Sequence, residues 1–294
     1  MKVLVTGAKG QVGSELILEG EILGIRMLAR GRAELDITEQ KTVNKFIQTH
    51  KPDILINAAA YTAVDKAESE PDLAYSINCD GAANLARTCA DNDIPLLHIS
   101  TDYIFDGCKV GAYIETDTPN PQCVYGKSKL EGEQAIESIL EHHIILRVSW
   151  VFGANGDNFV KTMLRLAKER DLINVVADQH GGPTWAGDIA ATLMKLANRW
   201  GDGEPVPWGT YHYSGQPATT WQGFAEAIFE RAEELEMIDK RLQVEPISTA
   251  EYPTPAQRPL NSILDCSKLA RQLDINQPDW RIGLRQVLVS WMQK

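Results

Sequence analysis

The first thirteen residues restrict the fold more than any other stretch of the chain. Residues 3–5 form a short apolar run rich in β-branched side chains, and residues 11–18 carry apolar side chains at helical spacing. Between them stand glycines at intervals of three, Gly7, Gly10 and Gly13. The stretch predicts a strand, a tight glycine turn and a helix whose N-terminus can hold a pyrophosphate. An ordinary strand-to-helix turn is the alternative.

Strand-like and helix-like segments alternate through the first half of the chain. Strands are predicted at residues 25–29, 53–58, 96–100 and 144–148, and helices at 41–49 and 72–92. This alternation predicts an α/β fold, a Rossmann-like doubly wound parallel sheet covered by helices on both faces. Ligands of such sheets bind beyond the carboxyl ends of the strands. Polar residues that directly follow a strand are therefore the candidates for a site.

Beyond Trp150 the pattern changes to helices separated by turn-rich segments. These helices are predicted at residues 158–168, 188–200, 220–235 and 281–292. We expect a dinucleotide-binding domain over residues 1–150, with about 186–216 returning to it. A smaller C-terminal substrate-binding domain is expected over about 151–185 and 217–294.

Composition excludes several classes of partner. The 294 residues carry a net charge of −11, which argues against nucleic acid and anionic membranes as main partners. The five cysteines are scattered without a C-x-x-C pair, as is typical of a reducing compartment. The chain opens directly on a strand, and its apolar stretch at 54–64 is too short to cross a bilayer. We expect a cytoplasmic protein, and no metal-ligand spacing is found among its histidines.

A tyrosine and a lysine four residues apart form the second informative feature. Tyr125 and Lys129 open a segment with apolar residues at helical spacing, so both side chains share one helix face. An ammonium about 4 Å from a phenol contributes about 4 kcal/mol at an effective dielectric constant of about 20, which is roughly the energy needed to lower the phenol's pKa by about three units. Such a pair would suit acid–base work at a carbonyl. Thr101 ends a predicted strand, where its hydroxyl could bond the same carbonyl oxygen. A chance pair on a surface helix is the alternative.

The glycine turn, Thr101 and the Tyr125–Lys129 pair occur in the order that the sheet requires. In this the chain resembles the extended short-chain dehydrogenase/reductase family, in which a Tyr, a Lys and a Ser or Thr are catalytic. Longer strings narrow the resemblance to the dTDP-4-dehydrorhamnose reductases. These strings cover residues 57–68, 100–107, 147–153, 178–184 and 258–262.

The resemblance implies an NAD(P)H-dependent oxidoreductase that reduces the C4 ketone of dTDP-4-dehydro-β-L-rhamnose to dTDP-L-rhamnose, a precursor of lipopolysaccharide. Tyr125 would give a proton to the oxygen, Thr101 would hydrogen-bond it, and Lys129 would hold the nicotinamide ribose and bias Tyr125. The implied substrate-binding residues are Thr101, Asp102, Trp150 and Arg258. The residues expected to bind the cofactor are Gly7, Gly10, Gln11, Val12, Gly13, Arg30, Asp36, Ile37, Ala60, Tyr61, Thr62, Tyr125 and Lys129.

The end of the second predicted strand bears on the choice of cofactor. An acidic residue there selects NAD, whereas an arginine accommodates the 2′-phosphate of NADP. Arg30 and Arg32 come first, and Glu34 and Asp36 follow later. We therefore expect NADPH to be preferred, with NADH as a second option. The resemblance also implies a homodimer and allows magnesium, with Glu15 at one carboxylate position, but it assigns no set of metal ligands.

Two other functions fit the same features. One is another nucleotide-sugar enzyme of this fold, an epimerase or a dehydratase. Dehydratases of this group typically follow the catalytic threonine with Asp-Glu, whereas Thr101 is followed by Asp102-Tyr103. The other is a non-catalytic regulatory subunit of the same fold, which the presence of Thr101, Tyr125 and Lys129 together disfavours.

Overall fold

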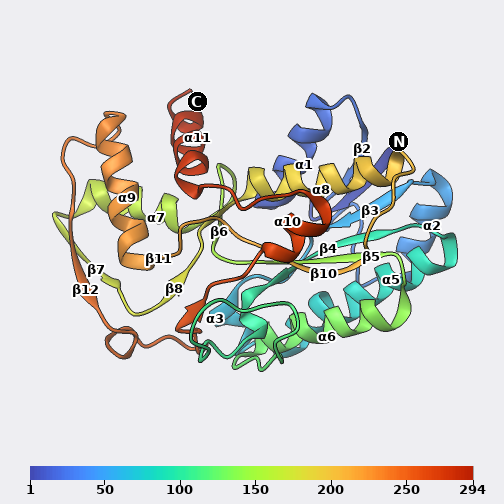
Figure 1. The fold of residues 1–294 in the computed structure, drawn as a ribbon, viewed down its shortest axis with the longest axis horizontal. Coiled ribbons are helices and arrows are strands. Elements are labelled where there is room, and N and C mark those ends of the chain that lie inside the picture. The colour runs from blue at the N-terminus through green and yellow to red at the C-terminus, as the bar shows by residue number, and fades with distance from the viewer. Residues whose placement is uncertain (294) are drawn as a thin grey trace.

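A six-stranded, fully parallel sheet organises the structure, a computed structural model that describes residues 1–293. The strand order is β10-β5-β4-β3-β1-β2 (Figure 1). The strands are β1 (Lys2–Thr6), β2 (Arg26–Arg30), β3 (Ile54–Asn57), β4 (Leu96–Thr101), β5 (His143–Val148) and β10 (Gly209–Tyr213). The order reverses between β1 and β3, and the carboxyl ends of β1, β3 and β4 meet at one edge.

Helices cover both faces of this sheet, which confirms the doubly wound α/β fold (Figure 1). Helices α1 (Gln11–Ile22) and α8 (Ala186–Gly201) lie on one face, where Val3 and Val5 of β1 point. The other face holds Leu4 and is covered by α2 (Gln40–His50), α5 (Gly81–Asn92) and α6 (Val124–Ile139). Strand side chains alternate between faces, so both faces need apolar residues, and inner strands such as β3 are largely continuous apolar runs.

The helix expected at residues 72–92 is interrupted by a π-helical turn. Helix α4 (Pro71–Tyr75) leads through a π-helical segment (Ser76–Asp80) into α5. The carbonyl of Asn78 in this turn packs so close to Gly132 of α6 that a Cβ there would lie 2.1 Å from the oxygen. Gly132 thus lets α6 approach the π-turn closely, which helical periodicity alone does not reveal.

The remaining chain builds a second apolar core beside the sheet (Figure 1). It contains α7 (Phe159–Glu169), α9 (Trp221–Glu234), α11 (Trp280–Met292) and the parallel pair β7 (Leu172–Val176) and β12 (Gln243–Ile247). Shorter elements are α3 (Val64–Ala67), β6 (Val151–Phe152), β8 (His180–Gly181), β9 (Thr184–Trp185), β11 (Thr219–Thr220), β13 (Asn261–Ser262) and α10 (Ser267–Leu273). None of the helices in residues 1–293 is long and apolar enough to cross a membrane.

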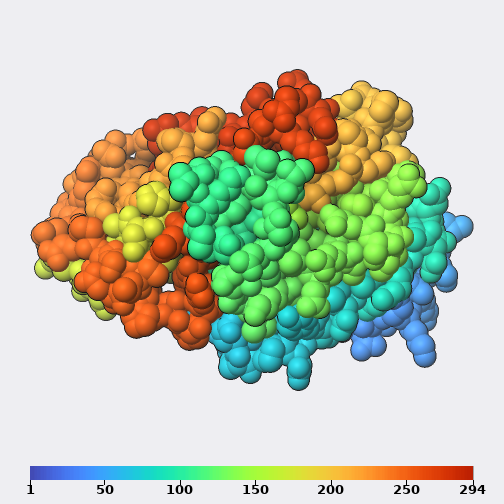
Figure 2. Space-filling model, turned by 60° about the horizontal axis from the view of Figure 1, so that its bottom comes forward, coloured from blue at the N-terminus to red at the C-terminus, as the bar shows by residue number. Residues whose placement is uncertain are grey.

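The loop after β4 joins the two parts of the molecule. Its Tyr113 exchanges backbone hydrogen bonds of 2.8 Å with the segment at Ile263 and Asp265. Asn261 adds side-chain hydrogen bonds to the carbonyls of Lys109 and Gly111. In the space-filling view the loop (green) lies directly against C-terminal segments (red) (Figure 2). The C-terminal segment is thereby held over the end of β4.

Candidate active site

The glycine turn after β1 leaves no room for side chains. Gly7 has a φ of +69°, and a Cβ there would lie 2.5 Å from the backbone at the end of β3. A Cβ on Gly13 would lie 2.2 Å from the Gly7 carbonyl oxygen. Gly10 is the N-cap of α1, has no side-chain cap and is exposed, and Gln11 and Val12 begin the helix. The open N-terminus of α1 therefore fits the pyrophosphate of a dinucleotide, because its N–H groups and dipole favour negative charge.

Arg30 lies beside this turn, at the end of β2. Its guanidinium donates to the carbonyl of the preceding residue at 2.7 Å and lies 5.0 Å from the ring centroid of Phe46. Burial would raise the pKa of Asp36, but hydrogen bonds from Thr38 and the Arg32 guanidinium outweigh it and lower the pKa. The Asp36 carboxylate is thus engaged by its own loop, while Arg30 has no anionic partner in the structure described.

The other residues expected at the cofactor lie along the same edge. Ile37 is buried in the core, and its carbonyl accepts a hydrogen bond from the Asn84 side chain at 3.1 Å. Ala60, Tyr61 and Thr62 follow β3, where the side-chain oxygen of Asn78 accepts from the Tyr61 N–H at 2.8 Å. The π-turn that carries Asn78 therefore fixes this loop, and Asn78 is a residue that the sequence analysis missed.

Thr101 and Tyr125 meet where β4 ends and α6 begins. Both are buried, at 5% and 9% exposure. Burial raises the pKa of Tyr125 above its ordinary value, and a hydrogen bond with the Thr101 hydroxyl offsets this only in part. Close packing sets the position of α6, because a Cβ on Gly126 would lie 2.2 Å from the carbonyl of Tyr103. The phenol thus keeps its proton at neutral pH and has a hydroxyl beside it.

Lys129 lies one turn after Tyr125 on α6, and it is 1% exposed. Its Nζ donates to the carbonyl of Ile99 at 2.7 Å and lies 3.0 Å from His98 Nε2. Burial lowers the pKa of Lys129 to about 8, although the charge of Glu133 raises it. The lowering of the Tyr125 pKa that the sequence predicts is absent, because the amine turns toward β4 and burial dominates at the phenol.

Asp102 is buried directly after Thr101, whose hydroxyl donates to its Oδ1 at 3.1 Å. Burial raises the pKa of Asp102 to about 6, while hydrogen bonds from Ser262 and Thr101 lower it. Ser262 belongs to β13, and a carboxyl and hydroxyls from distant segments thus meet at the site. Ser262 lies in one of the strings that carried the family resemblance but was not singled out.

Trp150 forms half of an aromatic pair beyond β5. It adopts a left-handed backbone with φ +46°, and its ring stacks on Trp221 with centroids 3.7 Å apart and planes 10° apart. The indole of Trp221 donates to Gln179 at 3.1 Å. A non-glycine residue in this conformation costs about 1–3 kcal/mol, so surrounding contacts hold Trp150 there. Sequence reasoning missed Trp221, because no spacing links residues 71 positions apart.

Arg258 is paired inside the protein. Its guanidinium bonds Asp65 at 2.7 Å and the hydroxyl of Tyr103 at 3.0 Å. The Tyr103 ring packs edge-on against the Tyr125 ring with centroids 5.5 Å apart, so Tyr103 links Arg258 to the Tyr125 phenol. A diphosphate bound by this guanidinium would have to compete with Asp65.

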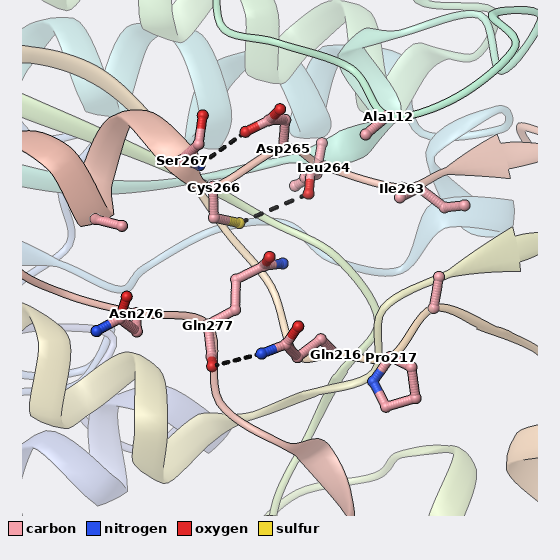
Figure 3. Close-up of a pocket in the computed structure, with 12 residues that line it drawn as sticks. Ala112, Gln216, Pro217, Ile263, Leu264, Asp265, Cys266, Ser267, Asn276 and Gln277 are labelled. Atoms are coloured by element: carbon pink, nitrogen blue, oxygen red, sulfur yellow. Dashed lines mark hydrogen bonds between the residues drawn. The ribbon is translucent and has the colours of Figure 1, made fainter.

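No metal centre is evident near these residues. Within residues 1–293, no group of three or more His, Cys, Asp or Glu side chains could hold an ion. A cavity of about 430 Å³ lies elsewhere, beside α10, and Gln216, Gln277 and Cys266 are among the residues that line it (Figure 3). It includes none of the residues predicted to act in catalysis.

Comparison with known proteins gives the family. Residues 1–292 match the family model described as RmlD substrate binding domain. The chain is 47% identical to dTDP-4-dehydrorhamnose reductase of Aggregatibacter actinomycetemcomitans, over 97% of this chain and 98% of that protein. A reductase of that name from Clostridium acetobutylicum superposes over all of both chains with a TM-score of 0.91 at 37% identity. The Bacillus anthracis reductase, solved in complex with NADP, does so at 38% identity with a TM-score of 0.91, over 98% of this chain and 99% of that one. The chain therefore belongs to the family of the RmlD substrate binding domain, whose relatives named here are dTDP-4-dehydrorhamnose reductases.

Proposed function

We propose that this protein reduces the C4 ketone of dTDP-4-dehydro-β-L-rhamnose to dTDP-L-rhamnose, with NADPH as the preferred reductant. The observation that carries the proposal is the meeting of the Thr101 and Tyr125 hydroxyls at the sheet edge that also bears the glycine turn. Membership of the reductase family supplies the substrate class. Arg30 at the end of β2 supports NADPH over NADH.

The side chains divide the chemistry between them. The Tyr125 phenol, whose pKa burial raises, holds the proton that passes to the ketone oxygen as it becomes an alkoxide. Thr101 hydrogen-bonds the same oxygen and stabilises the charge that develops there. When bound, a reduced nicotinamide dinucleotide supplies the hydride. Lys129 is assigned to the nicotinamide ribose, and the open N-terminus of α1 to the pyrophosphate.

The sugar nucleotide is assigned to the other side of the same edge. Asp102 and Arg258 lie there with Thr101, and the flat face of Trp150, stacked on Trp221, suits a sugar or a base. We assign residues 1–150 and 186–216 to dinucleotide binding and 151–185 and 217–294 to the sugar nucleotide. In support, β10 joins the large sheet and α8 packs on α1.

The family also suggests the setting of the reaction. We propose a cytoplasmic homodimer that serves lipopolysaccharide biosynthesis, with no membrane or nucleic-acid partner. Magnesium rests on the family resemblance alone, with Glu15 as one candidate ligand, and takes no part in the proposed chemistry.

The test is direct. Incubation with dTDP-4-dehydro-L-rhamnose and NADPH should consume one NADPH for each dTDP-L-rhamnose identified by NMR. Tyr125→Phe should lower kcat at least about 100-fold, because the proton donor is lost. Tyr113→Phe is the matched control, since its hydroxyl bonds Asp106 and the backbone of the loop after β4. A Tyr125→Phe enzyme as fast as the parent would refute the mechanism, and no NADPH loss would refute the function.

A further inference from the structure

A line of buried polar side chains runs across the sheet beneath the proposed site. Thr6, Asn57 and His98 stand directly opposite one another in the register of β1, β3 and β4. The Thr6 hydroxyl lies 2.6 Å from Asn57 Oδ1, Asn57 Nδ2 lies 2.9 Å from His98 Nδ1, and His98 Nε2 lies 3.0 Å from Lys129 Nζ. None of the four residues is more than 1% exposed. Because these side chains are buried, donors and acceptors must match along the line.

One backbone group sets the direction of these hydrogen bonds. The N–H of Ala59 donates to Asn57 Oδ1 at 3.0 Å, and a backbone N–H can only donate. The oxygen of the Asn57 amide must therefore face Ala59, and its NH₂ must face His98. Since an NH₂ group can only donate, Nδ1 of His98 accepts and carries no proton.

The remaining proton of His98 then lies on Nε2. Burial lowers the pKa of His98 well below its ordinary value, so the ring is neutral. A neutral imidazole with an unprotonated Nδ1 carries its hydrogen on Nε2. This N–H points at Lys129 Nζ.

An ammonium has three donors and no acceptor, so it cannot receive a hydrogen bond from His98. A neutral amine can accept that bond with its lone pair while it donates to the carbonyl of Ile99. We propose that His98, fixed in one tautomer by Asn57, favours the neutral amine of Lys129 over the ammonium in this position. His98 and Asn57 are positioning residues, and the importance of Lys129 for the reaction rests on the proposed function.

The other ionisable groups around Lys129 are consistent with this assignment. Glu133, one turn along α6, favours the ammonium, but Arg147 engages its carboxylate. Tyr125 precedes Lys129 by one turn, and Asp102 follows β4. The pKa of Lys129 nevertheless falls to about 8, because burial outweighs the charge of Glu133.

The sharpest test is Asn57→Asp, which reverses the donor-to-acceptor direction of the hydrogen bonds from residue 57 through His98 to Lys129. One carboxylate oxygen still accepts from Ala59 and Thr6, and the other now accepts from His98 Nδ1–H. Nε2 then becomes an acceptor that an ammonium can satisfy. The titration midpoint of Lys129 should therefore rise by about one pH unit or more, and Nδ1 of His98 should become protonated.

Both quantities are measured by NMR on the full chain. Nitrogen-15 shifts of labelled histidine report the tautomer, and carbon-13 shifts of lysine Cε against pH report the midpoint, with Lys129→Arg identifying the signal. A second variant, His98→Asn, keeps an acceptor toward Asn57 but removes the donor toward Lys129, so the midpoint should also rise. Asn84→Asp, a change at another buried asparagine that bonds Ile37 and Thr38, controls for burying a carboxylate and should leave the midpoint unchanged.

The proposal is overturned if His98 of the parent protein carries its proton on Nδ1, or if Lys129 titrates near the ordinary value of about 10.4. It is also overturned if a folded Asn57→Asp protein leaves the Lys129 midpoint where it was. The tautomer of the parent protein decides the matter even if both variants fail to fold. None of these measurements needs substrate, so their failure is distinct from a failure to reduce the keto sugar.

Discussion

Replacing Glu133 with glutamine should remove about 3–5 kcal/mol from the free energy of unfolding. Glu133 on α6 and Arg147 on β5 form an ion pair whose side chains are only 1% and 6% exposed. Arg147 Nη2 lies 2.6 Å from Oε2, and Nε lies 3.1 Å from both carboxylate oxygens. Glutamine keeps the shape of this contact but removes its negative charge.

The size of the effect follows from what surrounds the guanidinium. Its remaining neighbours are the carbonyl of Glu115 at 3.5 Å, the ring of His212 at 3.5 Å and the face of Phe105 at 5.5 Å. None of these contacts carries a negative charge, since the two polar atoms are a backbone oxygen and a ring nitrogen. The positive charge of Arg147 would therefore stay buried without compensation.

Replacing both partners with apolar residues gives the opposite expectation. Glu133→Leu combined with Arg147→Met removes both buried charges, so the double variant should unfold within about 1 kcal/mol of the parent or be more stable. Urea unfolding at pH 7 measures both values, provided that the m-values agree. The exposed pair Arg165–Glu169 supplies the control, and Glu169→Gln should change stability by less than about 0.5 kcal/mol. A Glu133→Gln loss below 1 kcal/mol, or a double variant as unstable as the single one, would refute this reasoning.

Two further predictions concern single charges. Burial raises the pKa of Asp188 to about 6 from about 3.9 in the unfolded chain, so its carboxylate destabilises the fold above pH 6 and this cost vanishes as the pH falls to about 4. Asp188→Asn should thus stabilise the protein by about 1–2 kcal/mol at pH 7, after allowance for partial exposure, and by little at pH 4; urea unfolding at both pH values checks this, and an equal gain at both would contradict it. Arg30→Ala should lower kcat/KM for NADPH about 10- to 100-fold with little effect on NADH, and steady-state kinetics showing equal losses would exclude Arg30 from the 2′-phosphate.

The sheet could be predicted because its strands are buried on both faces. Ile54–Asn57 and His143–Val148 are apolar runs bounded by polar or turn residues, and both agree with the predicted strands within one or two residues. The pair β7 and β12 escaped prediction, because Leu172–Val176 alternates between exposed and buried residues and its partner lies about 70 positions further on. Pairing across that distance leaves no local signal.

The placement of the site was more predictable than its electrostatics. Parallel strands end at one edge, so Thr101 could be expected near Tyr125. The partner of Lys129 could not, because His98 lies inside an apolar strand, where a lone histidine resembles an ordinary core residue. Helical spacing fixes the face on which Lys129 lies, but neither its rotamer nor the group that meets its amine.

One face of α6 joins the proposed chemistry to the stability of the fold. Tyr125, Lys129 and Glu133 recur at intervals of four residues, so they form one row along the helix. Each meets a different polar group of the sheet: the hydroxyl of Thr101, the carbonyl of Ile99 and the guanidinium of Arg147. A shift of α6 along its axis would misalign all three contacts at once. Together with the close packing at Gly126, these contacts fix the height at which the Tyr125 phenol stands above the sheet edge.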